Sequence, residues 1–306
     1  MQVISLYITS ILIWGTTWIA ISFQLGDIAT EVSLAYRFAI ASTILFIYCW
    51  LKKLNLRFNK QQHIRFFGIA MTMFGFNFYL LYSGQHLLNS ALAAIAFATL
   101  VVMNIINSRL FLNSKVSSQE VLGALLGLVG ICVLFWPELN SQNLNSEAIV
   151  GLGLCLLGTY VASLSNMLSV SNQRQKLPIV QTNAWAMAYG AATMALLAMV
   201  KGSPFVVDLP LTYWLSMGYL SLFGSIIAFG CYLSLLDKIG ASKTSYITVI
   251  TPAFAVVIGA MFEGFVLNNF IVGGICLILL GNIVVLYKRK PKTKVIVSQN
   301  PQTNSI

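Results

Sequence analysis

The segment LNSALAAIAFATLVVMNIINSRLFL, at residues 88–112, has a counterpart in IGASKTSYITVITPAFAVVIGAMFE, at residues 239–263. Each segment is apolar over most of its length and is long enough to cross roughly 30 Å of hydrocarbon as a helix. The two segments lie about 150 residues apart, which is close to half of the 306-residue chain. The pair therefore indicates a chain made of two related halves, each built from membrane helices.

Other residues repeat at the same offset along the chain. The matches are Gly68 with Gly218, Tyr82 with Tyr232, Ala91 with Ala241, and Gly123 with Gly273 or Gly274. Apolar segments can also resemble each other by chance. Agreement of the Gly and Tyr positions across several helices favours a true repeat.

The composition is that of a membrane protein. Hydrophobic residues make up 58% of the chain and charged residues only 8%, whereas ordinary soluble domains carry about 25% charged residues. In lipid every backbone amide must be satisfied within its own segment, so the apolar runs are expected to be helices. The predicted spans lie at residues 3–23, 32–51, 64–84, 88–110, 119–137, 148–168, 180–200, 212–235, 243–262 and 268–287.

The charges alternate between the two sides of these spans. All of the 18 Lys and Arg except Arg37 and Lys201 fall on one side, which includes the C-terminal tail. All of the 8 Asp and Glu except Glu120 and Asp237 fall on the other side. Because Lys and Arg resist translocation, the basic side is predicted to be cytoplasmic. Both termini are therefore expected on the cytoplasmic side of a bacterial inner membrane.

The fold class follows from the span count. Five spans per half is an odd number, so the second half enters the membrane from the opposite side. The sequence therefore predicts an all-α membrane protein with ten transmembrane helices, arranged as two inverted five-helix repeats at 1–143 and 144–287. A basic, disordered cytoplasmic tail is expected at 288–306. Many secondary transporters are built from inverted repeats around a midplane cavity.

Polar and aromatic side chains follow helical stripes in several spans. Such side chains are costly in lipid and usually face the bundle interior or a water-filled cavity. We expect substrate-binding roles for Trp14, Thr17, Trp18, Asn77, Tyr82, Thr99, Tyr160, Ser163, Tyr232 and Thr248. The alternative for the hydroxyls is bonding back to their own helix, and for Trp and Tyr it is a place at the membrane interface.

Two predicted spans, 119–137 and 268–287, carry almost no polar side chains. Their glycines, including Gly123 and Gly127 at G-x-x-x-G spacing, permit close approach of helix backbones. These spans are expected to act as scaffold, and the striped spans are expected to line the cavity.

Arg37 and Pro252 are candidates for a charge role and a gating role. Arg37 lies inside the second span, where it could pair with Glu31, reach the outer interface, or contact a substrate anion. Pro252 cannot donate a backbone hydrogen bond, which frees the carbonyl of Thr248. The break could act as a hinge or ligand contact, or it could be a static kink.

The sequence contains no pattern of an enzyme or of a metal site. No G-x-x-x-x-G-K-[ST] loop is present, so ATP hydrolysis is not expected. No Ser/His/Asp set or H-E-x-x-H motif supports catalysis, and no cofactor is expected. Although the net charge is +10, the basic residues sit in short loops between spans, so a nucleic-acid partner is not expected either.

The chain resembles the EamA-type branch of the drug/metabolite transporter superfamily. The resemblance rests on WGTTW at 14–18, Arg37, NFYLLYSGQHLLNSALAAIAFATL at 77–100, RLFL at 109–112 with GALLGLVGICVLF at 123–135, and the run from Gly240 to Leu286. It covers nearly the whole chain. Its motifs are loose, and the layout of ten helices in two halves is its specific element.

The resemblance implies export or exchange of small metabolites such as amino acids by alternating access, with scaffold roles for the fifth and tenth helices. The chain departs from the family in its fourth helix. Members of the family often have a Pro in that helix and an acidic residue after it. Val102 and Asn113 stand there, whereas the second half keeps Pro252 and Glu263.

The leading functional hypothesis is a secondary transporter that exports a small amphipathic metabolite such as an amino acid. The alternatives are a channel and a non-transporting membrane receptor for a small metabolite. The expected partners are the substrate and the lipid bilayer. No polar stripe uniquely marks an outer face, so the sequence does not decide the oligomeric state and is compatible with a monomer.

Overall fold

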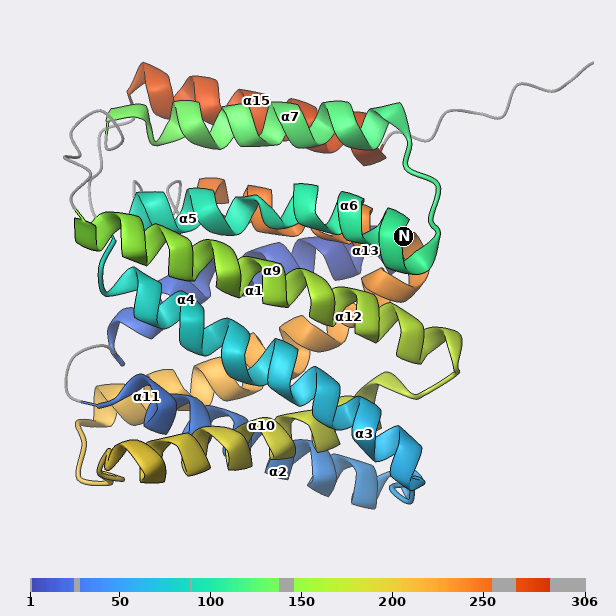
Figure 1. Cartoon of the computed structure of the whole chain (residues 1–306), viewed down its shortest axis with the longest axis vertical. Coiled ribbons are helices and arrows are strands. Elements are labelled where there is room, and N and C mark those ends of the chain that lie inside the picture. The colour runs from blue at the N-terminus through green and yellow to red at the C-terminus, as the bar shows by residue number, and fades with distance from the viewer. Residues whose placement is uncertain (1, 25–27, 89, 138–145, 255–267, 287–306) are drawn as a thin grey trace, which may run out of the picture.

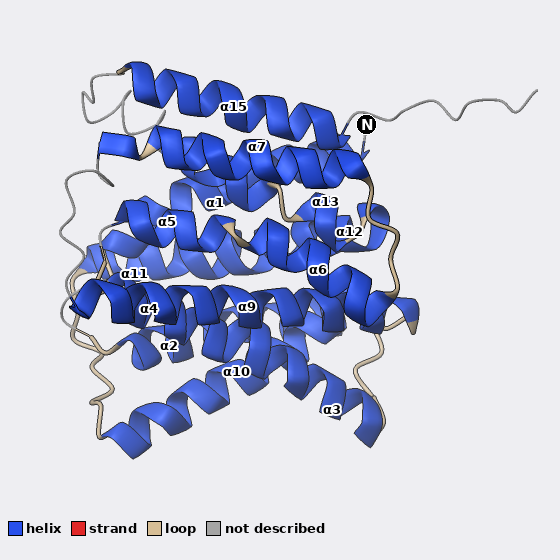
Figure 2. Ribbon diagram, turned by 45° about the horizontal axis from the view of Figure 1, so that its top comes forward, coloured by secondary structure: helices blue, strands red, loops and turns tan. Residues whose placement is uncertain are grey.

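The computed structural model describes residues 2–24, 28–88, 90–137, 146–254 and 268–286, and within these ranges it is helical and contains no strand (Figures 1 and 2). The α-helices are α1 (Gln2–Ser22), α2 (Thr30–Leu51), α3 (Lys60–Ile69), α4 (Asn77–Gln85), α5 (Ser90–Ala98), α6 (Leu100–Leu112), α7 (Ser118–Leu134), α9 (Ser146–Arg174), α10 (Ile179–Lys201), α11 (Leu211–Tyr219), α12 (Ala228–Ile239), α13 (Ala241–Thr244) and α15 (Asn269–Leu286). Two π-helical segments, η1 (Ala70–Phe76) and η2 (Leu220–Ile227), join α3 to α4 and α11 to α12.

Six of the described helical runs are long and apolar enough to cross a membrane, and three further apolar helices are shorter. The six runs are Thr30–Leu51, Lys60–Gln85, Ala93–Leu112, Ser146–Arg174, Ile179–Lys201 and Leu211–Ile239. The ninth predicted span, 243–262, lies partly outside the described residues, and the tail at 288–306 lies wholly outside them. The count of ten helices therefore stays a prediction.

The connections that carry basic residues gather at one end of the bundle. The α2–α3, α6–α7 and α9–α10 connections reach the same end as the N-terminus in Figure 1. We call this the basic end, defined by residues 52–65, 109–115, 174–176 and 238–243. The connection between α10 and α11 lies at the opposite end.

Local sequence signals explain several helix ends. A capping box begins α3, because Asn59 Oδ1 accepts from the Gln62 backbone N–H at 2.9 Å while Gln62 Oε1 accepts from the Asn59 N–H at 2.9 Å. Asn113 ends α6 and Gly202 ends α10, both in the left-handed conformation, with φ of 50° and 70°. These are residue types that adopt that conformation at low cost.

The helices of the first half pack against particular helices of the second half. The principal pairs are α2 with α10, α7 with α15, α4 with α9, α1 with α12, and α6 with α9, and α6 also contacts α13. Figures 1 and 2 show α7 and α15 side by side at one edge of the bundle, and α2 and α10 together at the other.

Glycines bring α7 and α15 into backbone contact. A Cβ added to Gly274 would lie 2.6 Å from the Leu134 nitrogen and 2.7 Å from the Gly130 carbonyl oxygen. A Cβ on Gly281 would lie 2.8 Å from the Gly123 carbonyl oxygen. Such close approach needs small residues on both helices. The G-x-x-x-G spacing predicted close contact for this helix, and the structure confirms it at Gly123.

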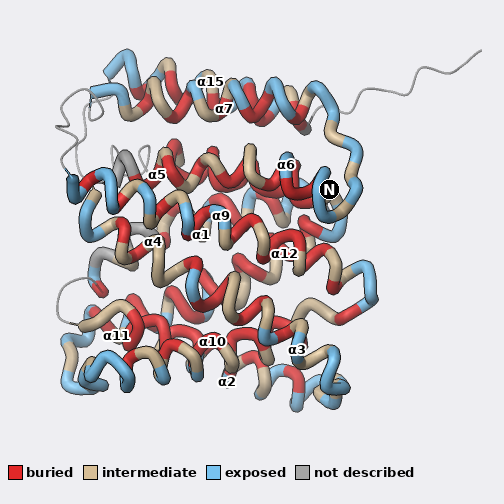
Figure 3. The backbone as a smooth tube through the Cα atoms, viewed as in Figure 1, coloured by how far each residue is buried: buried red, intermediate tan, exposed pale blue. Residues whose placement is uncertain are grey.

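Side chains are buried along the inner faces of the helices and exposed along the outer faces, as Figure 3 shows. Phe38 and Phe74 are fully buried and meet edge to face with ring centroids 5.2 Å apart. Large apolar side chains such as Trp50 and Val200 are instead 74% and 78% exposed. An apolar outer surface of this kind suits contact with lipid.

We expect Gly274→Ala to destabilise the protein by about 1–3 kcal/mol, because the new methyl group meets backbone atoms that cannot move without separating α7 from α15. The matched control is Gly153→Ala in α9, where an added Cβ meets nothing within 4 Å. Thermal unfolding in detergent measures both changes. Equal midpoints for the two variants would contradict the close contact.

A candidate substrate cavity between the two halves

The described residues enclose a cavity of about 130 Å³ in the middle of the bundle. It is lined by Trp14, Thr17, Ile21, Arg37, Met73, Asn77, Phe78, Leu81, Tyr82, Gln85, Ala93, Ala94, Phe97, Leu100, Ala162, Ser165, Asn166, Phe229, Tyr232, Thr248, Thr251 and Pro252. These side chains come from both halves of the chain. A second cavity of about 10 Å³, lined by residues of α9 and α10 among others, has room for about one water molecule.

Aromatic rings form one wall of the main cavity. Trp14 contacts Phe229 edge to face at 5.3 Å between ring centroids and Tyr232 at 5.0 Å. The Trp14 indole N–H donates to the Gly224 carbonyl in η2 at 3.3 Å. This bond fixes the ring, so the wall presents a rigid apolar surface to anything in the cavity.

Arg37 reaches the cavity from α2. Its Nε donates to Ser225 Oγ at 2.8 Å, and Ser225 in turn donates to the Leu220 carbonyl, five residues earlier in η2. The Ser221 hydroxyl donates to the Arg37 backbone carbonyl at 3.2 Å. The guanidinium also lies 5.3 Å from the centre of the Phe78 ring. The π-helical segment therefore supplies hydrogen bonds to the side chain and the backbone of Arg37, and Phe78 of α4 packs against the guanidinium.

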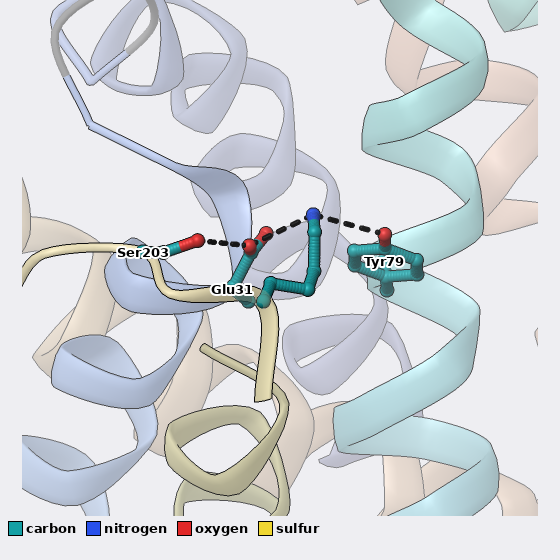
Figure 4. Close-up of polar contacts among 4 residues, drawn as sticks. Glu31, Tyr79 and Ser203 are labelled. Carbon is teal, nitrogen blue, oxygen red and sulfur yellow. Dashed lines mark hydrogen bonds and ion pairs between the residues drawn. The ribbon is translucent and has the colours of Figure 1, made fainter. Parts of the chain in front are cut away.

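The structure shows that Arg37 does not pair with Glu31, which was one of the sequence-based alternatives. Glu31 binds Lys201 at 2.8 Å and accepts from the Ser203 hydroxyl at 2.7 Å, as Figure 4 shows. Lys201 also donates to the Tyr79 hydroxyl at 3.3 Å. The pairing was missed because Lys201 lies far along the chain, at the C-terminal end of α10, and α10 packs on α2.

Hydrogen bonds between amides and hydroxyls connect the helices on the basic-end side of the cavity. Asn166 in α9 donates to the Tyr232 hydroxyl at 3.0 Å and to Asn104 Oδ1 at 3.4 Å. Asn107 donates to Ser163 Oγ at 2.8 Å. Together these bonds tie α6, α9 and α12. At the other side the lining includes Gln85, the last residue of α4. The cavity thus extends toward the end of the bundle opposite the basic end.

Most of the predicted binding residues meet at this cavity. The lining includes the predicted residues Trp14, Thr17, Arg37, Asn77, Tyr82, Tyr232, Thr248 and Pro252. The side chain of Trp18 lies outside the described residues. The structure thus brings these eight residues together at one cavity. Their binding or gating roles stay predictions.

Three predicted residues do not line the cavity. Tyr160 is 41% exposed on the outer face of α9, and Ser163 is buried against Asn107 of α6. Thr99 donates to the Ala96 carbonyl at 2.6 Å, at the break between α5 and α6. A polar stripe does not fix the rotation of a helix, and α9 turns the face with Ala162 and Asn166 toward the cavity instead.

Some lining residues were not selected from the sequence. Phe229 and Asn166 contribute as much to the walls as the selected aromatic and amide residues. Their signal was present, because Phe229 precedes Tyr232 by three residues on the same helical face. Ala93, Ala94 and Ala162 gave no signal, since small apolar residues are common throughout the chain.

Comparison with known proteins decides the family. The model of the EamA-like transporter family matches residues 1–136 and 149–287. The chain belongs to this family. Together with the membrane-length helices, membership makes it a multi-pass inner membrane protein, and the resemblance inferred from the sequence is confirmed.

Its relatives share about a quarter of their residues with it. Protein PagO of Salmonella typhimurium is 26% identical over 262 residues, which cover 84% of each chain. The uncharacterized transporter YoaV of Bacillus subtilis is 26% identical over 256 residues, covering 81% of this chain and 84% of the relative. The uncharacterized inner membrane transporter YedA of Escherichia coli K12 is 26% identical over 294 residues, covering 92% of this chain and 90% of the relative.

A solved crystal structure has the same fold. It superposes with a TM-score of 0.77 at 19% sequence identity, covering 92% of this chain and 95% of that one. The names of the family and of YoaV and YedA are those of transporters, which agrees with the expectation that the chain is not an enzyme.

We expect Lys201→Met to lower the free energy of unfolding by about 1–2 kcal/mol, because it leaves the buried Glu31 carboxylate without its ammonium partner. The Lys201 side chain is 44% exposed, which limits the effect. Adding Glu31→Gln should recover part of the loss. Thermal unfolding in detergent is the measurement, with exposed Lys52→Met as the control. A loss no larger than that of Lys52→Met would contradict the pairing.

Proposed function

We propose that this chain is a secondary transporter that moves a small amphipathic metabolite, such as an amino acid, across the inner membrane by alternating access, in the direction of export. The observation that carries the proposal is the central cavity, walled by both halves of the chain. Its volume of about 130 Å³ has room for on the order of ten water-sized groups, which is the size of an amino acid.

The inverted repeat is part of this proposal, and the helix pairing supports it. In chain order the proposed helices form two sets of five. α2 and α10 are the second helices of the two sets, and they pair with each other. α7 and α15 are the fifth helices, and they also pair with each other. α1, the first helix of its set, packs against α12, part of the third helix of the other set. In the same way, α9, the first helix of the second set, packs against α4, part of the third helix of the first set. A two-fold relation between the halves produces such reciprocal contacts.

The two π-helical segments support the same relation. η1 begins at Ala70 and η2 at Leu220, an offset close to that of the sequence repeat, and each interrupts the third helix of its half. π-helical turns are rare and often lie at functional sites. We propose that the two segments allow the third and eighth helices to bend as the cavity opens toward one side and closes toward the other.

Transport is tested by counterflow in proteoliposomes with a panel of amino acids, nucleobases and vitamins. We expect saturable exchange of at least one solute. A channel would instead conduct in a planar bilayer without saturation at low solute concentration. Failure of every solute in the panel, at an amount of folded protein verified by its melting curve, would count against a transporter.

Trp14→Ala should reduce the counterflow of the transported solute about tenfold, because it removes the aromatic wall of the cavity. The control is Trp50→Ala, since Trp50 is 74% exposed on the outside of the bundle. Initial rates of the two variants, compared with wild type, give the result. Equal rates for both variants would place the binding site elsewhere.

The proposed orientation puts both termini and the basic end in the cytoplasm. Epitope tags at either terminus should therefore be protected in intact spheroplasts. A tag inserted between Ser203 and Asp208, at the opposite end, should be accessible to antibody. Tags at the two termini found on opposite faces of the membrane would overturn the orientation and the even number of spans.

A further inference from the structure

The cavity contains a charge without a counter-ion among the described residues. Among the described residues of the lining, Arg37 alone is charged, and its side chain is 3% exposed. Its Nε is bonded to Ser225 and the neutral Tyr82 hydroxyl also interacts with the guanidinium, but Nη1 is buried and has no hydrogen-bond partner among the described residues. The acidic residue nearest in its helix, Glu31, is already bound by Lys201 and Ser203.

The neighbouring rings do not replace a counter-ion. Phe38 and Phe78 lie 5.7 Å and 5.3 Å from the guanidinium carbon, and each ring face attracts a cation. Neither ring carries a negative charge, and neither accepts a full hydrogen bond from Nη1. A charged group among transmembrane helices that faces a cavity marks a ligand path by default.

A second polar atom without a hydrogen-bond partner belongs to another residue of the same lining. Asn77 lines the cavity from α4, is 7% exposed, and has a buried Oδ1 without a hydrogen-bond partner. Nη1 of Arg37 is a donor and Oδ1 of Asn77 is an acceptor. A ligand that satisfies both must offer an acceptor to one and a donor to the other.

We propose that Arg37 binds the carboxylate of the transported molecule, and that Asn77 Oδ1 accepts an N–H or O–H of the same molecule. The substrate class is then a small monocarboxylate with an apolar or aromatic body, which packs against Trp14 and Phe229. This proposal rests on the proposed function, because it takes the cavity as the transport site. It deepens that function by assigning the group that is recognised.

A purely structural role for Arg37 explains less of the geometry. Its bond to Ser225 and the bond from Ser221 to its backbone carbonyl do tie α2 to η2. That tie uses Nε and the backbone and leaves Nη1 unpaired. A buried donor without a partner destabilises the folded protein, and a bound carboxylate removes the deficit with a charge-assisted bond.

The first test needs no variant. Thermal shifts of the wild-type protein are measured with 3-phenyllactate, with its neutral amide 3-phenyllactamide, with L-phenylalanine and with sodium chloride, at constant ionic strength. The α-hydroxyl gives both the acid and the amide a donor for Asn77, so the two differ only at the group offered to Arg37. We expect both carboxylates to raise the midpoint more than the amide does. Three results would overturn the proposal: the acid and its amide raise the unfolding midpoint equally, neither carboxylate raises it, or chloride alone raises it as much as the carboxylates do.

The second test changes the guanidinium. Arg37→Gln should weaken binding of 3-phenyllactate by about ten- to hundredfold and leave binding of the amide within a few-fold of wild type. Arg37→Lys, which keeps the charge without the fork, should retain part of the preference for the acid. Arg65→Gln is the control, because Arg65 contacts Ser171 and Asn172 at the basic end. An unchanged ratio of acid to amide affinity in Arg37→Gln would overturn the role of Arg37.

The two proposals fail in different ways. If the chain is not a transporter, counterflow is absent for the whole solute panel even where the thermal shifts favour carboxylates. If the chain is a transporter that does not recognise a carboxylate, counterflow is present and neutral analogues compete as well as acids do. The ratio of inhibition by 3-phenyllactate and its amide separates these results.

Discussion

A charge placed among apolar helices must be paired or solvated, and this constraint decides where the few charges of the chain stand. Glu31 and Lys201 form an ion pair, and each makes a further hydrogen bond, Glu31 with Ser203 and Lys201 with Tyr79. Arg37 stands in a cavity that water or a ligand can enter. Glu31 already pairs with Lys201 where the ends of α2 and α10 meet, so it does not neutralise Arg37. In our proposal the Arg37 guanidinium is therefore available to a ligand.

The cavity exists because two helices take no part in it. α7 and α15 pack backbone to backbone through glycines at the edge of the bundle, and neither contributes to the lining. Each glycine makes room for a backbone segment or a side chain of the partner helix, such as Ile278 against Gly130 and Leu134 against Gly274, so the two helices stay together by close contact. The remaining helices are then free to turn their polar and aromatic faces toward the centre. In this fold the scaffold role and the lining role fall on different helices.

Periodicity and charge predicted much of this arrangement from the sequence. They predicted the helical class, the positions of most helices, the gathering of basic loops at one end and the contact at Gly123. They did not predict the rotation of α9, which turns Tyr160 outward, because a stripe with polar residues on two faces is compatible with more than one rotation. The Glu31–Lys201 pair and the π-helical turns depend on how distant helices pack, which local sequence does not encode.

The bonds beside the cavity at the basic end have a strength suited to a switch. They join neutral amides and hydroxyls, with Asn166 contacting both Tyr232 and Asn104. Each such bond contributes only about 0.5–1.5 kcal/mol net. In the proposed alternating-access cycle, a few of them would give a gap of a few kcal/mol between closed and open states, which differential binding of a ligand can overcome. An ion pair sealed in hydrocarbon would resist opening far more strongly, since separating it leaves two unpaired charges. In the proposed cycle, neutral polar side chains on this side leave the charge on Arg37 to the proposed carboxylate ligand.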